Sequence, residues 1–360
     1  MKRIVKRDAF QTASDSEHKM TSPSGRNGRI PALDFTKGAL VLIMVLYHWL
    51  NYFLGMQGDI YKYLRFLTPS FIFITGFLIS NVYFSKYKIA DPRLAKRLVQ
   101  RGLKILGVFI LLNVVRTLLL PQPYRGQMVF EHFAIRNLAN VYLIGTDLGG
   151  GQGKAVAFYI LVPISYLLLL SAALLLLSGW FKYIFHVVLG LFLVGIVVLD
   201  LNGLQSANLE LLAIGLMGVI LGYTPIEKIN TFVRHPYSLA AAYICYVGAI
   251  TVWNVIYPLQ VIGVCLSLMI IYLLGEQGDQ PGRVRSCIIL LGKYSLFGYI
   301  AQIFILQLLH RGLWRVDLGV AGLGLSFCAA FALTILAVEA TDRVRARVVP
   351  VDRLYKAVFA

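Results

Sequence analysis

Leu161-Val-Pro-Ile-Ser-Tyr-Leu-Leu-Leu-Leu-Ser-Ala-Ala-Leu-Leu-Leu-Leu-Ser178 contains no charged residue, and this stretch decides the class of fold. With its flanks it approaches the ~20 residues that an α-helix needs to cross ~30 Å of hydrocarbon. Val187 to Leu199 and Leu259 to Gly275 are uncharged in the same way. The whole chain is 58% hydrophobic and 14% charged, far less charge than a soluble domain of this length carries. These features predict an integral membrane protein.

We predict an all-α, polytopic membrane protein with about ten transmembrane helices, because apolar blocks of this kind recur along the chain. The expected helices span residues 33–54, 63–84, 99–120, 155–178, 182–199, 206–223, 237–256, 258–275, 287–309 and 319–339. Residues 31–345 would form the transmembrane domain. Residues 1–30 are polar and of mixed charge, so we expect a disordered cytoplasmic tail there, and residues 346–360 would form a second cytoplasmic tail.

The distribution of basic residues predicts the orientation in the membrane. The chain has 34 Lys and Arg against 17 Asp and Glu, a net charge of +17. With the N-terminus in the cytoplasm, about 26 of the 34 basic residues fall on the inner side, in agreement with the positive-inside rule. We therefore expect both termini in the cytoplasm and the protein in the inner (plasma) membrane. Topology explains the charge, so no nucleic-acid partner is expected.

The first predicted helix contains ionisable residues, which are costly inside a membrane and usually mark a functional site or a polar cavity. Lys37 and His48 are eleven residues apart, so they lie about 16 Å apart along a helix and on one face of it. Asp34 and Asn51 fall within about 40° of the same stripe. We expect Lys37 near the cytoplasm and His48 in the outer half of the bilayer.

This layout is typical of an enzyme that uses coenzyme A. A cation near the cytoplasm can hold the phosphates of acyl-CoA, and the long pantetheine arm can pass through an apolar channel to His48. Because an imidazole titrates near neutral pH, His48 is a candidate general base for an acceptor hydroxyl. A structural interpretation stays open: Asp34 and Lys37 would form an ion pair at the interface, and His48 would hydrogen-bond between packed helices.

The same residues resemble the opening of the acyltransferase 3 family of membrane proteins. That family has a Leu-Asp, a basic residue followed by Gly, and a His separated from the basic residue by ten positions; Leu33-Asp34, Lys37-Gly38 and His48 fit this pattern. Its second helix carries Phe-Phe-x-x-Ser-Gly-Phe-Leu, which Phe71–Leu78 resembles with Ile and Thr at two positions. Arg101–Ile105 is similar to its Arg-x-x-Arg-Ile, with Lys at the second basic position. The first two helices also resemble the related heparan-type acetyltransferases.

The resemblance implies ten helices, acyl-CoA as the donor, and acylation of sugars in surface glycans. It implies that His48 is the catalytic histidine, and that Lys37, Arg101 and Lys104 bind the donor. To these we add Arg97 from the same basic cluster, and Asp34 as a catalytic residue that holds Lys37 in place. Acetyl-CoA is the expected co-substrate, with no permanently bound cofactor and no metal ion. The family often has a His in its ninth helix, where Gln302 stands here.

Four residues are candidates for the acceptor side: Glu210, Asn51, Arg116 and Tyr159. Glu210 is expected near the outer end of the sixth helix, where a carboxylate could orient His48 or bind acceptor hydroxyls. Arg116 is expected near the outer end of the third helix and could pair with Glu210. The alternative, which is common for such residues, is an interfacial carboxylate with no role in binding.

Our first hypothesis is an O-acyltransferase that moves an acyl group, expected to be acetyl, from acyl-CoA to a saccharide hydroxyl. Transfer would be direct, because no Ser or Cys with a nearby base stands out as a nucleophile. The second hypothesis is a transporter or flippase of a glycan or lipid-linked intermediate, which would favour repeated halves with broken helices. Residues 1–180 and 181–360 show no convincing repeat. A third, purely structural membrane subunit would leave the register of Lys37 and His48 to chance.

Overall fold

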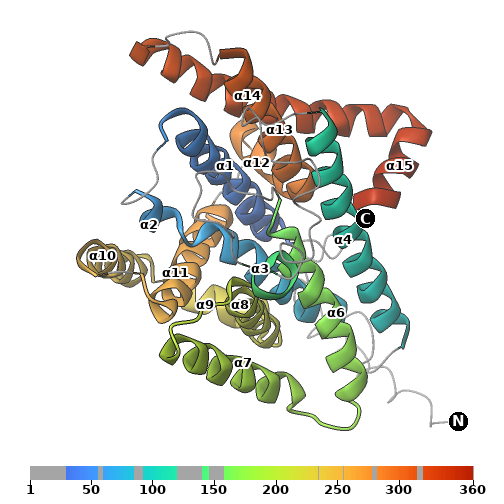
Figure 1. Ribbon diagram of the computed structural model, residues 1–360, viewed down its shortest axis with the longest axis vertical. Helices are drawn as coiled ribbons and strands as arrows, with labels where there is room; N and C mark the ends of the chain where they lie inside the picture. The colour runs from blue at the N-terminus through green and yellow to red at the C-terminus, as the bar shows by residue number, and fades with distance from the viewer. Residues whose placement is uncertain are drawn as a thin grey trace, which may run out of the picture. The chain divides into compact units, whose positions relative to one another are not determined.

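α-Helices make up nearly all of the part of the chain that the computed structural model describes (Figure 1). The described residues are 30–55, 60–84, 92–119, 140–145, 158–233, 235–253, 255–277, 282–313 and 319–359. These ranges contain no β-strand, so the predicted all-α class is confirmed. The tail predicted over residues 1–30 lies outside them, apart from Ile30.

The helices keep the labels of Figure 1. Their bounds are α1 Pro31–Phe53, α2 Tyr61–Leu64, α3 Leu67–Leu78, α4 Pro92–Leu119, α6 Leu161–Leu177, α7 Ile184–Leu201, α8 Ala207–Leu221, α9 Ile226–Val233, α10 Pro236–Val252, α11 Tyr257–Glu276, α12 Arg283–Lys293, α13 Ser295–Leu313, α14 Gly319–Arg347 and α15 Val349–Phe359. Two short segments are π-helical, η1 Ile79–Phe84 and η3 Asn140–Ile144.

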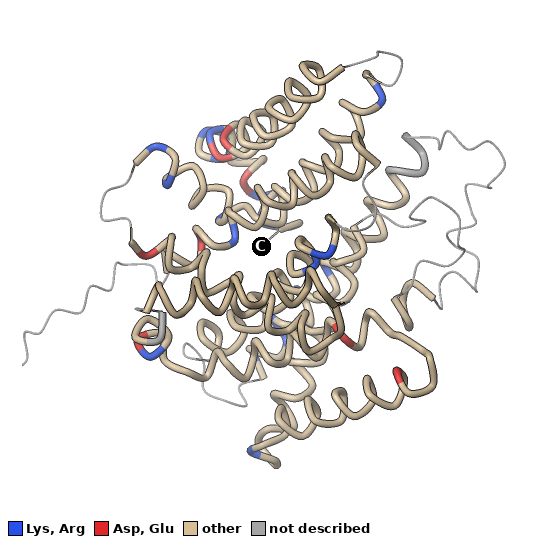
Figure 2. Tube along the Cα trace, turned by 90° about the vertical axis from the view of Figure 1, so that its left-hand side faces the viewer, with Lys and Arg blue, Asp and Glu red and all other residues tan. Residues whose placement is uncertain are grey.

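The length and apolarity of these helices define a polytopic membrane protein. Among the described residues, seven helical stretches are long and apolar enough to cross a membrane, and α6, α8 and α10 are shorter apolar helices. Most of the helical trace carries no charge (Figure 2). On α7, large apolar side chains such as Val187, Leu191 and Val194 are exposed, as expected for a surface that faces lipid. Ten crossings, and the cytoplasmic position of both termini, stay predictions.

Several segments differ in detail from the prediction, among them α4, which begins at Pro92 and not at residue 99, and α9, which was not predicted. Residues 287–309, predicted as one helix, belong to α12 and α13, which meet at Tyr294, where the backbone departs from helical angles (φ −108°, ψ 25°). The last predicted span ended at residue 339, but α14 continues to Arg347, because the end of an apolar run marks the membrane boundary and not the end of the helix. The predicted C-terminal tail contains α15.

Glycines allow α1 to pack closely against α12. A β-carbon at Gly292 would lie 1.6 Å from the carbonyl oxygen of Asp34, and one at Gly38 would lie 1.9 Å from that of Ile288. Only glycine therefore fits at either position. In a membrane, close backbone approach at small residues is a principal source of helix association. This contact fixes the position of α12, and of α13 after it, relative to the first helix.

Glycines also allow α3 to pack closely against α8. A β-carbon at Gly76 would lie 2.0 Å from the carbonyl oxygen of Gly215, and one at Gly218 would lie 2.2 Å from that of Phe73. The hydroxyl of Ser80, in η1, donates to the Val219 carbonyl at 2.6 Å. The second predicted helix is therefore held against α8 along most of its length.

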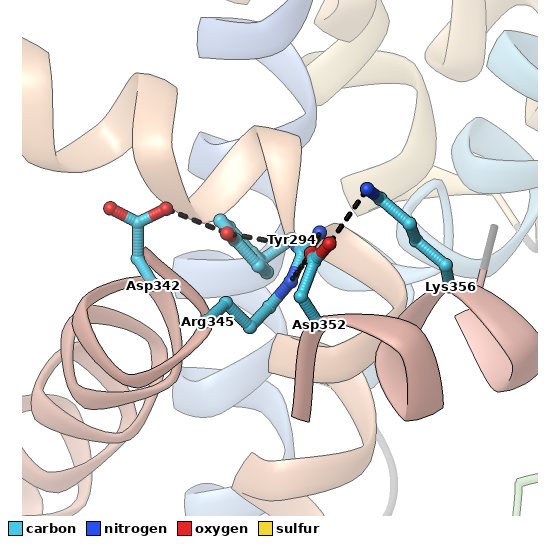
Figure 3. A network of polar contacts seen from close by, with 5 residues as sticks. All are labelled: Tyr294, Asp342, Arg345, Asp352 and Lys356. Carbon is cyan, nitrogen blue, oxygen red and sulfur yellow. Dashed lines mark hydrogen bonds and ion pairs between the residues drawn. The ribbon is translucent and has the colours of Figure 1, made fainter. Parts of the chain in front are cut away.

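A polar network ties the C-terminal helix α15 to the rest of the chain (Figure 3). The Tyr294 hydroxyl donates to Asp342 at 2.6 Å, and Arg345 donates to that hydroxyl at 2.9 Å. Arg345 also binds Asp352 of α15 at 2.6 Å, and Lys356 binds the other carboxylate oxygen at 2.6 Å. The Arg345 guanidinium lies 3.8 Å from the centroid of the Tyr355 ring, a cation–π contact. These contacts dock α15 against the junction of α12 and α13.

Gly292→Val should destabilise the protein by about 1–3 kcal/mol or more, because the new side chain forces α1 and α12 apart. Thermal unfolding of the purified protein in detergent measures the loss as a lower Tm. Gly190→Val on α7 is the matched control, since a β-carbon there meets nothing within 4 Å among the described residues. Equal Tm values for the two variants would contradict the close contact.

The docking of α15 should weaken in acid. Lys356 and Arg345 hold the pKa of the Asp352 carboxyl below its usual value of 3.8. The stabilisation is therefore complete above that value and is lost as the pH falls through the lowered pKa. The Tm of the unmodified protein should fall more between pH 6 and pH 3 than that of Asp352→Asn, with Asp200→Asn as the control. Identical pH profiles for the unmodified protein and Asp352→Asn would show that this carboxylate contributes nothing.

Candidate functional site

An elongated, mostly apolar cavity of about 130 Å³ lies between α1, α3, α4, α6 and α13. Its wall along α3 and η1 extends from Phe71 to Tyr83, twelve residues and therefore roughly 18 Å. Ile164 and Leu168 of α6 and Ser295 and Tyr299 of α13 line other sides. This shape suits a long and narrow ligand, because such a ligand would contact all five helices.

Two cations from different helices border this cavity: Lys37 of α1 and Arg101 of α4. The remaining wall is almost entirely apolar, with Thr75, Tyr83, Ser295 and Tyr299 as its uncharged polar residues. Cations beside an apolar channel are costly in a membrane and indicate a site for anionic groups. The structure thus brings together two of the four residues that the sequence assigned to the donor.

Arg101 is held by Tyr83, a residue that the sequence analysis did not single out. Its Nη1 atom donates to the Tyr83 hydroxyl at 2.5 Å. Tyr83 belongs to the π-helical segment η1, and π-helical turns are rare and often occur at functional sites. Ile79 and Tyr83, the first and fifth residues of this segment, both line the cavity wall. A Tyr at the expected inner end of the second helix was the available signal, but it is also typical of a membrane interface.

Lys37 is paired with Asp34, as both interpretations of the sequence required. Its Nζ atom lies 2.6 Å from Asp34 Oδ1, and the two side chains are 18% and 11% exposed. The pair lies where α1 meets α12, since the Asp34 backbone contacts Gly292. Asp34 therefore fixes the Lys37 ammonium at the cavity wall while leaving it two further N–H donors.

His48 lies on the same helix but does not border the cavity. The residues between it and Lys37 on this face, Val41 and Met44, are buried at 0% and 2% exposure. His48 itself is half-buried, and its ring contacts that of Tyr47 edge to face, with 5.0 Å between the centroids. The cavity therefore contains the cation of the predicted pair, and the imidazole lies about three helical turns farther along α1.

Helix α13 runs parallel to α1 and bridges this interval. A β-carbon at Gly298 would lie 3.3 Å from Val41, and Leu306 shares a buried cluster with Val45 and Trp49. In this alignment of α13 with α1, Tyr299 lies at the cavity. Gln302, three residues later on α13, lies at about the level of Val45 of α1. Gln302 is fully buried, and neither amide atom has a hydrogen-bond partner among the described residues. A buried amide without a partner requires an explanation, such as a bound polar molecule.

The other donor candidates on α4 are placed differently. Arg97 and Lys104 are exposed, as Arg101 is, but they are not part of the cavity wall. Arg116 belongs to α4, but its side chain lies outside the described residues, so its predicted pairing with Glu210 does too. Among the described residues, no group of three or more His, Cys, Asp or Glu is arranged to hold a metal ion.

Of the acceptor candidates with described side chains, two lie at or near the start of α8 and one lies near the end of α1. Glu210, at the start of α8, is close to the charge of Arg65, and its backbone carbonyl accepts a hydrogen bond from Tyr257 at 3.4 Å. The Tyr159 hydroxyl donates to the side chain of Asn208. Asn51 is half-buried near the end of α1, three residues beyond His48.

Comparison with protein-family models, curated proteins and solved structures finds no match to this chain. The function proposed below therefore depends on the residues and on their geometry.

Proposed function

We propose that this protein is a membrane O-acyltransferase that moves an acyl group, acetyl in the simplest case, from acyl-CoA to a hydroxyl of a sugar in a surface or secreted glycan. The observation that supports it most is the pair of cations, Lys37 and Arg101, on one elongated apolar cavity. Coenzyme A has the matching chemistry, with anionic phosphates at one end and a long, largely uncharged arm. The chain would work in the inner (plasma) membrane, with both termini in the cytoplasm.

Each residue has a distinct role in this proposal. Arg101, oriented by Tyr83, and Lys37, oriented by Asp34, bind phosphate oxygens of the donor. The exposed Arg97 and Lys104 attract the anionic donor towards α4 through longer-range electrostatics. The arm lies along α3 past Thr75 to Tyr299, and transfer requires the thioester to reach His48, about three helical turns farther along α1. The donor needs this second stretch because the cavity alone does not contain His48.

The chemical step is a direct transfer. An acceptor hydroxyl oxygen attacks the thioester carbonyl carbon, and His48 accepts the hydroxyl proton as the new C–O bond forms. The C–S bond breaks, and the thiolate leaves and takes up a proton, giving an ester and free coenzyme A. No covalent enzyme intermediate is needed.

The cations can be tested through donor binding alone. Lys37→Ala and Arg101→Gln should each weaken acetyl-CoA binding roughly tenfold or more, because each removes a hydrogen bond to a charged group. Isothermal calorimetry on protein in detergent measures the Kd. Lys228→Ala, an exposed Lys on α9, is the control and should leave the affinity unchanged. Unaltered acetyl-CoA affinity in both cavity variants would remove the donor site from this cavity.

His48 can be tested through the reaction. His48→Ala should reduce transfer of labelled acetyl from CoA to a glycan acceptor about 100-fold or more, which is the usual contribution of a general base. Its acetyl-CoA affinity should stay within twofold of the unmodified protein, and His186→Ala on α7 should behave like the unmodified protein. Full transfer activity in His48→Ala would disprove the assignment. A transporter or flippase needs two compartments, so acetyl transfer in detergent micelles also separates the enzyme from that alternative.

A further inference from the structure

A second cavity, of about 70 Å³, lies against a different face of α3 from the cavity that Lys37 and Arg101 border. It lies between α1, α3, α8, α9 and α11, and Ile74 of α3 borders both cavities. The reaction scheme above does not use it. We propose that this second cavity binds one acyl chain of a membrane phospholipid. The inference does not depend on the proposed function.

Two close helix contacts leave this space unfilled. On one side α8 meets α3, where a β-carbon at Gly218 would lie 2.2 Å from the Phe73 carbonyl oxygen. On the other side α11 meets α1, where a β-carbon at Gly275 would lie 2.9 Å from the ring of Phe35 and 3.1 Å from the Ala32 carbonyl oxygen. The helices of each pair are therefore fixed and do not close the space between the pairs. An empty apolar space costs stability because the atoms around it lose dispersion contacts, which a hydrocarbon chain would restore.

The chemistry of the wall indicates an apolar ligand. Among the wall residues that the structure describes, none is charged. The Thr36 hydroxyl donates to the Ala32 carbonyl within α1 at 2.8 Å, and the Tyr272 hydroxyl donates to the Asn230 side chain at 2.9 Å. The other described wall residues are aliphatic, aromatic or sulfur-containing. A polar group placed here would lose its hydrogen bonds to water without replacement, whereas an alkyl chain would lose nothing.

One end of the second cavity is formed by α9, which has the character of an interfacial helix. This short helix is amphipathic. Ile226 and Ile229 line the cavity, and the residues between them, Glu227 and Lys228, are exposed. Amphipathic helices of this kind lie in the plane of the membrane interface. The cavity therefore begins at the level of the lipid headgroups.

From α9 the cavity extends along α11 into a membrane-spanning stretch. Tyr272, which bonds Asn230 of α9, lies four residues before the end of α11 at Glu276. Cys265 lies seven residues before Tyr272, and both line the cavity, which therefore extends roughly 10 Å along the helix. This helix is one of the stretches long and apolar enough to cross a membrane. A cavity that extends from the interface towards the bilayer centre has the depth and direction of a lipid chain.

The surface of α11 provides a route from the bilayer into the cavity. Ile262 is 47% exposed, as expected for a side chain that faces lipid. Cys265 and Met269 fall within about 60° of Ile262 around the helix, and both are half-buried and line the cavity. The cavity wall is therefore continuous with the lipid-facing surface. A transmembrane helix, about 10–12 Å in diameter, is too wide for this space, so a helix of a second copy of the chain does not fit.

Photo-crosslinking tests the site in the unmodified protein. The protein in dodecyl maltoside is mixed with an equimolar amount of a phosphatidylglycerol that carries a diazirine in its acyl chain, and the adducts are mapped by peptide mass spectrometry. Phe73 and Phe77 are 7% and 6% exposed and line the cavity, so a chain inside it is what reaches them. We expect adducts there and on Cys265. Phe109 of α4, which is 2% exposed and borders neither cavity, is the matched control and should carry none.

A cavity-filling variant tests occupancy. Cys265→Trp places an indole where the chain would lie. After release from nanodiscs of phosphatidylglycerol and phosphatidylethanolamine, native mass spectrometry should find one phospholipid fewer on this variant than on the unmodified protein. Cys245→Trp, at an exposed cysteine of α10, is the matched control and should retain the lipid. If Cys265→Trp does not fold, Ile226→Gln on α9 replaces it and should lower retention, because its amide would lie at an apolar wall.

Three results would overturn the inference. The first is a set of adducts confined to exposed faces such as that of α7, with none on Phe73, Phe77 or Cys265. The second is equal lipid retention by the cavity variant and the unmodified protein. The third is a dimer that Cys265→Trp dissociates, which would assign the cavity to a side chain of a second copy. Neither measurement uses acetyl-CoA, so the outcome is separate from that of the acyltransferase proposal.

Discussion

The close contact between α1 and α12 is the constraint on which the site depends. The backbones meet at Gly38 and Gly292, where no side chain of any size fits. In lipid, helices gain little by burying apolar surface against one another, so such contact is a main source of specificity. It fixes the level of α13 against α1, and so places Ser295 and Tyr299 on the cavity that Lys37 also borders.

Lys37 and Arg101 are each held by a neighbouring side chain, although the cavity wall itself contains no Asp or Glu among the described residues. Asp34 pairs with Lys37 from the same helix, and Tyr83 orients Arg101 from the neighbouring one. Both cations therefore keep N–H groups for a ligand, which a closed ion pair with two carboxylates would not allow. The environment around His48 is different, because Val41 and Met44 are packed between it and this cavity. The proposed reaction accordingly uses two regions of one helix.

Much of the fold could be predicted, because the cost of placing charge in hydrocarbon makes apolar length a strong signal. Each predicted segment contains an apolar helix, including the pair on either side of residues 254–256. The break at Tyr294 and the π-helical turn at Ile79–Phe84 were not predicted, since both depend on packing and not on hydropathy. In the candidate site, the Asp34–Lys37 pair followed from spacing on one helix. Tyr83 and Tyr299 were missed, because nothing in a single sequence tells which helices are neighbours.

The sequence by itself determined an all-α membrane protein, the pairing of Asp34 with Lys37, and the shared face of Lys37 and His48. These are properties of single helices, and they depend only on composition and on a period of 3.6 residues. The tertiary structure alone decided that Arg101 joins Lys37 at a cavity while Arg97 and Lys104 do not, and that Gln307 of α13 meets Tyr52 of α1. Which face of a helix meets which partner is set by close contacts between segments far apart in the chain, and helical periodicity carries no information about them.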